Sequence, residues 1–211
     1  MGISERRERE REGIRRKILD AARELFARDG YEAVTMRKIA EAIEYSPTAI
    51  YLHFKDKESL VRELCLVDFD SLARAFQRIA REPDPLERLR KVGLAYADFA
   101  LEHPNHYRLM FMTPHPAPGK DQAEFEKRKG NPEGDAYAFL VATVSEAIEK
   151  GLLRPELKDP QLVAQAAWAG VHGVVSLHVA KGEDPWIDWK PLKKTVALVV
   201  DSFSRGISRE G

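Results

Sequence analysis

The chain has 211 residues, enough for one large or two small domains with a substantial hydrophobic core. Its 34 Lys and Arg side chains balance its 34 Asp and Glu side chains, so the net charge points to no class of partner. The single cysteine, Cys65, excludes an internal disulfide and a zinc site built from several cysteines. It suits a reducing compartment. The N-terminus is charged rather than apolar, so we expect no signal peptide and a cytoplasmic location.

Within residues 1–13, positions 5–12 are all Arg or Glu, and two interpretations of the segment remain open. One is a solvated extension of the following helix, held by alternating charges. The other is a flexible charged arm whose arginines reach phosphates or a minor groove, and this is how the segment is treated in our domain assignment. The arginines concerned are Arg6, Arg7, Arg9 and Arg11.

Three helices are predicted within the following 45 or so residues. Ile14, Ile18, Ala22 and Leu25 form a helical stripe that ends near Gly30, a residue suited to a left-handed helix cap. A second helix is predicted to begin after the N-cap Thr35. A third follows the N-cap Ser46, with Pro47 in its first position, where a missing N–H costs nothing.

The stretch Thr35 to Lys57 therefore predicts a helix-turn-helix. Its second helix has only about two turns and leaves Thr48, Tyr51 and His53 outside its apolar face. A helix this short is not stable by itself. We interpret it as a recognition element that the rest of the chain holds in place.

Beyond this stretch the pattern predicts more helices and no strand. Expected helices cover about 56–82, 86–102, 107–112, 135–150, 159–180 and 192–203. Residues 113–134 are rich in proline and glycine and are expected to form a loop, with one helical turn near 122–129 as the alternative. The fold class is thus all-α with about nine helices. We place a domain boundary between residues 57 and 58, which separates a small N-terminal head from a larger helical bundle.

The segment from Leu162 to Ala180 is apolar on nearly every side, so we expect it to be covered all round. It contains Gln165, His172 and His178, which a membrane span tolerates poorly, and we therefore expect no membrane contact. With the stripe at 192–203 it predicts a homodimer through the last two helices, symmetric about a two-fold axis.

Residues 14–60 resemble the DNA-binding domain of the tetracycline-repressor (TetR) family. The matching residues are Ile18, Ala21, Ala22, Leu25, Phe26, Gly30, Thr35, Ile39, Ala40, Ser46, Ile50, Tyr51, His53, Phe54, Lys57 and Leu60. The resemblance implies an all-helical homodimer that represses transcription from a palindromic operator in double-stranded DNA. It also implies release by a small-molecule effector. On this basis we assign residues 1–57 to a DNA-binding domain and residues 58–211 to a ligand-binding and dimerisation domain. No cofactor is expected.

The resemblance assigns candidate DNA contacts to Thr35, Arg37, Ser46, Thr48, Ala49, Tyr51, His53 and Lys57. Thr48 and Ala49 are expected to read bases in the major groove, and Arg37 to reach the backbone or a base. Phosphate or sugar contacts are expected from the others. Packing against the first helix is the alternative for Tyr51, and a structural hydrogen bond is the alternative for His53.

The turn departs from the family pattern at two positions. Many members have glycine where this chain has Glu44, and a small aliphatic residue where it has Tyr45. We therefore expect either a positive φ at Glu44, which is strained for a residue with a side chain, or a turn of different shape.

The segment Trp168 to Gly173 resembles the Trp-His-Gly signature of one type of TetR C-terminal domain. Trp168 and His172 lie four residues apart, on one helix face. They are interpreted either as a packed core pair or as part of a mostly apolar ligand pocket for an apolar, aromatic or acyl effector. The candidate pocket residues are Phe69, Leu72, Phe76, Tyr96, Phe99, Tyr107, Met110, Phe111, Phe139, Trp168 and His172.

Three other kinds of site are not predicted. His103 and His106 flank a helix break without a third metal ligand, so no metal site is expected. Cys65 is expected to be a small buried hydrophobe. No nucleophile–base pair or phosphate-binding glycine loop occurs at a useful spacing, so the chain is not expected to be an enzyme. The remaining alternative to a ligand-controlled repressor is a non-inducible or architectural DNA-binding protein without a pocket.

Overall fold

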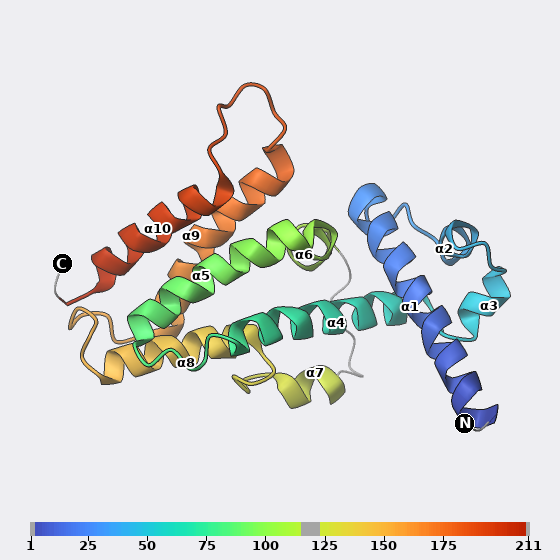
Figure 1. Ribbon diagram of the computed structural model, residues 1–211, viewed down its shortest axis with the longest axis horizontal. Helices are drawn as coiled ribbons and strands as arrows, with labels where there is room; N and C mark the ends of the chain where they lie inside the picture. Colours follow the sequence, from blue (N-terminus) through green and yellow to red (C-terminus); the bar gives the residue numbers. More distant parts are fainter. Residues whose placement is uncertain (1–2, 115–122, 210–211) are drawn as a thin grey trace. The chain divides into compact units, whose positions relative to one another are not determined.

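The computed structural model describes residues 3–114 and 123–209. In these ranges it contains ten helices and no strand beyond one isolated bridge between Leu153 and Ser208 (Figure 1). The all-helical fold class is confirmed. The helices are α1 (Ile3–Asp29), α2 (Met36–Ala42), α3 (Pro47–Tyr51), α4 (Lys57–Gln77), α5 (Pro85–Glu102), α6 (Pro104–Phe111), α7 (Ala123–Arg128), α8 (Ala136–Glu149), α9 (Pro160–Lys181) and α10 (Leu192–Ile207).

Two helices differ from the prediction. The long helix α4 ends at Gln77 rather than near Glu82, because the chain then tightens into turns in which the N–H of Ile79 donates to the carbonyl of Phe76. Helix α7 is additional to the nine helices predicted. It lies within the predicted loop, where the sequence offered a helical turn as the alternative. Residues 115–122 of that loop lie outside the described residues.

The chain forms two compact units. The first comprises the described residues up to Asp68 together with 105–114, and the second comprises 69–104 and 123–209. The first unit is therefore larger than the predicted domain 1–57, because it includes half of α4 and nearly all of α6. Local periodicity did not reveal this grouping, since it depends on long-range packing.

Large apolar side chains fill the core of the first unit. The fully buried ones are Ile18, Phe26, Val34, Ile39, Ile50, Leu60, Leu64, Tyr107 and Leu109. They come from α1, α2, α3, α4, α6 and the connection after α1. A short helix such as α3 is thus held by tertiary packing through Ile50, rather than by its own propensity.

A buried charge cluster lies within this apolar core. The Asp68 carboxylate is fully buried and accepts from Arg23 Nη2 at 2.9 Å and from Arg23 Nε at 3.2 Å. His106 Nδ1 lies 2.9 Å from the same carboxylate. Asp68 thereby connects α1, α4 and α6 within the first unit.

Local capping fixes the helix boundaries as the sequence predicted. Thr35 and Ser46 each accept a hydrogen bond from the N–H three residues later, at 3.2 Å in both cases. Before α4, Asp56 and Ser59 exchange hydrogen bonds in the manner of a capping box. Gly30 has φ 80° and its N–H donates to the carbonyl of Phe26, which confirms the left-handed cap of α1.

Residues 3–13 are helical and continue α1, so the structure shows the helix extension rather than the flexible arm. Residues 5–13 are exposed along this extension. An ion pair between Arg6 and Glu10 at 2.9 Å, and a bond from Arg9 Nε to the carbonyl of Glu5, support the helix at a spacing of four.

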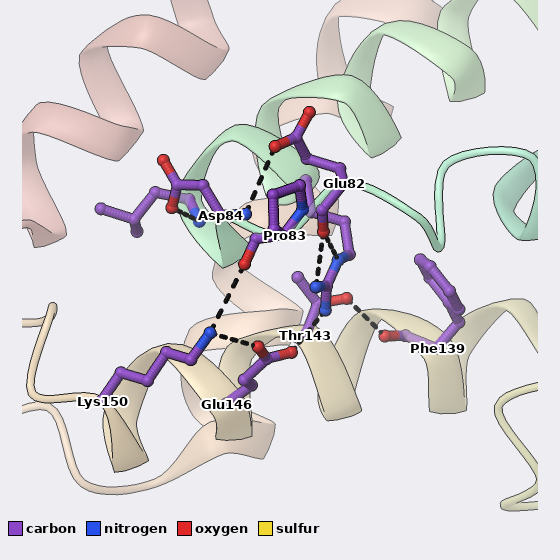
Figure 2. A network of polar contacts seen from close by, with 9 residues as sticks. Glu82, Pro83, Asp84, Phe139, Thr143, Glu146 and Lys150 are labelled. Carbon is purple, nitrogen blue, oxygen red and sulfur yellow. Dashed lines mark hydrogen bonds and ion pairs between the residues drawn. The ribbon is translucent and has the colours of Figure 1, made fainter.

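The second unit is a helical bundle in which α5 packs against α8, α9 and α10. Its α5 and α10 approach closely at Gly93, where an added Cβ would lie 2.7 Å from Val200 Cγ2. The connection before α5 is fixed by a polar network (Figure 2). Arg88 donates to the carbonyl of Glu82 through two nitrogens and pairs with Glu146 of α8 at 2.5 Å.

Helix α9 is not covered all round within one chain, contrary to the expectation from its sequence. Its buried residues are Val163, Ala164, Val171 and Val175. Leu162 and Leu177 on its other side are 62% and 58% exposed, and Leu198 on α10 is 67% exposed. By length and composition alone α9 could cross a membrane. Within the single chain, 22% of its apolar 18-residue window is buried, so most of this surface is left open.

Candidate nucleic-acid interface

Helices α2 and α3 form the predicted helix-turn-helix. The turn after α2 closes with two hydrogen bonds, from Tyr45 N–H to the Ala40 carbonyl at 2.9 Å and from Glu44 N–H to the Glu41 carbonyl at 3.2 Å. This is the Schellman pattern, which needs a left-handed residue after the helix end. Glu44 supplies it with φ 60° and is the one non-glycine residue with positive φ in the described chain. The strained alternative is therefore the one observed.

The predicted base-reading residues lie on the accessible side of α3. Thr48 is exposed and Ala49 is half-exposed, while Ile50 is fully buried in the core. Tyr51 is 54% exposed, so it does not take the alternative role of a core residue packed against the first helix. The neighbouring Leu52 is 74% exposed, which leaves the end of α3 open to a partner.

Three other candidates take part in contacts within the first unit. The hydroxyls of Thr35 and Ser46 cap α2 and α3, which orients these helix ends. Arg37 is exposed and pairs with Glu41 at 2.8 Å, an i,i+4 surface pair of small energetic value. Such a pair can be exchanged for a phosphate at little cost.

Lys57 is engaged more strongly than the sequence suggested. Its Nζ donates to the carbonyls of Tyr31 at 2.9 Å and Val34 at 3.0 Å. It also lies 4.0 Å above the centre of the Tyr31 ring. Lys57 thus holds the connection between α1 and α2 against the start of α4, a positioning role in addition to any contact with a phosphate.

Arg15 is a functional candidate that the sequence analysis missed. Its guanidinium pairs with the Glu63 carboxylate, and its Nη1 donates to the His53 carbonyl at 2.8 Å. It also lies 4.3 Å from the centre of the Phe54 ring. Arg15 therefore fixes the segment that follows α3 to α1 and α4. Its position four residues before the buried Leu19 gave no sign of these distant partners.

His53 is half-buried, and its Nδ1 has no hydrogen-bond partner among the described residues. Burial lowers the pKa of His53, and the positive charges of Arg11 and Arg15 lower this pKa further. The ring is therefore neutral near pH 7. The structural hydrogen bond offered as its alternative role is not formed by Nδ1.

Candidate pocket residues in the second unit form two sets of contacts. The Phe76 and Phe139 rings lie 6.1 Å apart. Tyr96 Oη and His172 Nδ1 form a hydrogen bond of 2.9 Å, and Trp168 lies beside His172 with ring centres 6.0 Å apart. Burial lowers the pKa of His172, so it is neutral near pH 7. A neutral hydrogen-bonded pair of this kind is well suited to an apolar environment.

The other candidates are placed differently. Phe99 is buried in the second unit, and the centres of the Phe99 and His103 rings lie 5.3 Å apart. Tyr107 is fully buried, and the centres of the Tyr107 and Phe111 rings lie 5.1 Å apart. Both residues belong to the first unit. The nine aromatic and histidine candidates are thus divided between the two units rather than assembled in one.

Comparisons with known proteins match two successive parts of the chain. Residues 18–64 match the family described as "Bacterial regulatory proteins, tetR family". Residues 89–203, more than half of the chain, match the domain described as "Tetracyclin repressor-like, C-terminal domain". The chain belongs to the TetR family. Whether its C-terminal domain is of the Trp-His-Gly type stays a prediction.

Three proteins illustrate how similar this TetR-family chain is to known sequences and structures. It is 31% identical over 151 residues to the transcriptional repressor KstR2 of Mycobacterium tuberculosis, covering 71% of this chain and 73% of KstR2. A TetR-family regulator from Marinobacter aquaeolei VT8 shares the fold with a TM-score of 0.73 at 23% identity, over 96% of this chain and 98% of that one. AibR, solved with isovaleryl coenzyme A and operator DNA, has a TM-score of 0.69 at 23% identity, over 92% and 97%.

No group of three or more metal-ligating side chains occurs in the part of this TetR-family chain that the structure describes. His106 pairs with Asp68, and His103 packs against Phe99, so the two histidines serve different contacts. Cys65 is buried, and burial together with the nearby Asp68 charge raises its pKa to about 12. A thiol of this kind is unreactive.

The strain at Glu44 predicts that Glu44→Gly raises the free energy of unfolding by about 1 kcal/mol, because glycine adopts positive φ without a clash. Gly30→Ala is the matched reverse change at the cap of α1 and is expected to lower it by a similar amount. Equilibrium urea denaturation measures both. A Glu44→Gly variant that is less stable than the parent, with Gly30→Ala destabilising as expected, would contradict the strain argument.

Proposed function

We propose that this TetR-family regulator is a homodimeric repressor that binds a palindromic operator and releases it when a small apolar or aromatic molecule binds. The main observation is the exposed side of α3, with Thr48 and Tyr51 accessible on a helix whose core side is anchored by Ile50. Selection of bound sequences from random duplex DNA tests the proposal and identifies the operator. Failure to enrich any sequence would reject it.

Within this proposal the residues of the interface divide into two roles. Thr48 and Ala49 read base edges in the major groove, where a helix can enter. Thr35, Ser46, Tyr51 and His53 contact phosphate or sugar and set the orientation, with Arg37 exchanging Glu41 for the backbone. The ammonium of Lys57 acts mainly through the loop at Tyr31 and Val34, and contributes its charge to the same surface.

Dimerisation through α9 and α10 is supported by the exposed apolar side of these helices. Leu162, Leu177 and Leu198 remain exposed in the single chain. Between them, α9 exposes the small residues Ala166 and Ala169, which permit close approach of a second helix. A symmetric dimer would place two heads about 34–36 Å apart in successive major grooves. Burial of this exposed apolar surface on dimerisation favours the dimer.

The proposed effector site centres on Tyr96, Trp168 and His172. This set offers aromatic walls with one neutral polar pair, the usual make-up of a small-molecule site. AibR was solved with isovaleryl coenzyme A, and a similar fold suggests an acyl thioester as the first class to test. Since α4 is one continuous helix shared by both units, it is the natural element to transmit binding to the head. Such a regulator acts in the cytoplasm and catalyses no reaction.

We expect Tyr51→Phe to weaken binding to all DNA sequences by about fivefold per head, through loss of one phosphate hydrogen bond worth about 1 kcal/mol in each protomer. Thr48→Ala should instead change the base preference at one operator position. Tyr45→Phe makes the same chemical change in the turn and should leave affinity unaltered. Fluorescence anisotropy on selected and random duplexes separates these outcomes. Unchanged affinity in Tyr51→Phe would remove the hydroxyl from the interface.

For the effector, we expect isovaleryl coenzyme A or a longer acyl coenzyme A to lower operator affinity, while coenzyme A alone does not. His172→Gln should raise the concentration of acyl thioester needed for half release without changing affinity for DNA alone. His178→Gln, on the same helix but packed against Trp189, is the matched control. If no acyl or aromatic compound shifts operator affinity, the non-inducible alternative is favoured.

The dimer proposal predicts that Leu162→Asp and Leu198→Asp each produce folded monomers in sedimentation velocity experiments. A charge at these exposed positions costs little in the monomer but a great deal in an apolar interface. Leu101→Asp on α5, which is 43% exposed in the single chain, is the control and should remain dimeric. Dimers that persist in both α9 and α10 variants would refute the interface.

A further inference from the structure

The helical extension at the start of α1 has a basic side that the contacts described so far leave unused. Helix α1 packs into the first unit from Ile14 onward, with Ile18 fully buried and Ile14 half-buried. Before Ile14 the helix runs on to Ile3 without covering any core. Figure 1 shows these N-terminal turns projecting beyond α2 and α3 within the same unit.

Arg7 and Arg11 continue the buried stripe of α1 into this extension. Positions 7, 11, 14 and 18 follow one another at spacings of four, three and four, so they lie along one helix side. The inward side of the helix therefore changes from isoleucine to arginine where the core ends. The Cα atoms of Arg7 and Arg11 are about 6 Å apart along the helix axis, given a rise of about 1.5 Å per residue.

The four arginines of the extension differ in their partners. Arg6 pairs with Glu10, and Arg9 donates to the carbonyl of Glu5. Arg7 and Arg11 form no hydrogen bond or ion pair with the described residues, and both are exposed. Arg6 and Arg9 also lie on other sides of the helix, whereas Arg7 and Arg11 lie on the side that carries positions 14 and 18 and present free guanidinium groups to an outside partner.

This basic side borders the segment that follows the recognition helix. Arg15, next in the series at a spacing of four from Arg11, donates to the His53 carbonyl at 2.8 Å. Arg11 lies one helical turn before Arg15 on the same side of α1, and its positive charge contributes to the lowered pKa of His53. Tyr51, two residues before His53 and the last residue of α3, is exposed. Arg7 and Arg11 therefore extend the proposed DNA-binding surface along α1.

We propose that Arg7 and Arg11 bind phosphates of the duplex flanking the base pairs that α3 reads, so that the α1 extension is a helical clamp on neighbouring DNA. The inference rests on the proposed function. Guanidinium groups bind phosphate oxygens in bidentate fashion, which favours arginine for this role. The clamp is sequence-independent, adds affinity through counterion release, and requires DNA beyond the base pairs contacted by α3.

Helical order of the extension is part of this inference, and Gly13 offers a test of it. Gly13 lies where the extension meets the packed part of α1, and an added Cβ there would meet nothing within 4 Å. Alanine in place of glycine stabilises an exposed helical position by about 1 kcal/mol. Gly13→Ala is therefore expected to make the extension more helical by circular dichroism and to strengthen binding to DNA with flanks.

The decisive experiment compares two double variants that remove the same charge. R7Q/R11Q removes the arginines on the side that continues the buried stripe, and R6Q/R9Q removes those on the other sides of the helix. Affinity is measured against salt concentration for the operator selected from random DNA, with and without flanks of about ten base pairs, one helical turn, on each side. On the flanked duplex, R7Q/R11Q should reduce the salt slope by about 2 per head. R6Q/R9Q should leave it nearly unchanged.

Further comparisons complete the test. Without flanks, R7Q/R11Q should bind like the parent chain, and R7K/R11K should retain most of the slope on the flanked duplex because the charge is kept. An unchanged slope in R7Q/R11Q, an equal loss in R6Q/R9Q, or weaker binding by Gly13→Ala would overturn the clamp. If the parent chain itself selects no DNA, the proposed function fails and the clamp with it.

Discussion

The buried carboxylate of Asp68 is the constraint on which the first unit depends. It lies at the midpoint of α4, has no exposed surface, and is shared by Arg23 of α1 and His106 of α6. Breaking such a pair by removing one partner typically costs about 3–5 kcal/mol, since the other charge is left buried and unpaired. The orientation of three helices is thus fixed by a single group, in a way that apolar packing alone would not specify.

This constraint explains why the first unit does not end where the helix-turn-helix ends. A three-helix head of about 55 residues would be marginal as an independent domain, because small domains bury a low fraction of their surface. The N-terminal half of α4 and the buried side of α6 add Leu64, Tyr107 and Leu109 to its core. Displacing α6 from α4 would expose these side chains and leave Asp68 with an incomplete set of partners. Any signal that reaches α6 therefore acts directly on the unit that carries α3.

Local features were predictable from the sequence, and long-range contacts were not. The caps at Thr35 and Ser46 were predicted because capping depends on residues within one turn. The strain at Glu44 was predictable for the same reason. In contrast, the partners of Arg15 and Lys57 lie 23 to 48 residues away, as does the carboxylate that pairs with Arg23. Helicity of residues 3–13 was left open because alternating charge is compatible with both a solvated helix and a coil.

Three features are unfavourable for the isolated chain, and they differ in what can compensate them. In the proposed symmetric dimer, the apolar side of α9 and α10 would be covered by an identical apolar surface. In the proposed clamp, phosphates would match the free arginines on α1 and remove their cost as a cluster of like charges. Glu44 keeps a positive φ in the turn before the proposed recognition helix α3. Because real chains tend to retain local strain at functional sites, the turn between α2 and α3 is a place where stability is below its optimum.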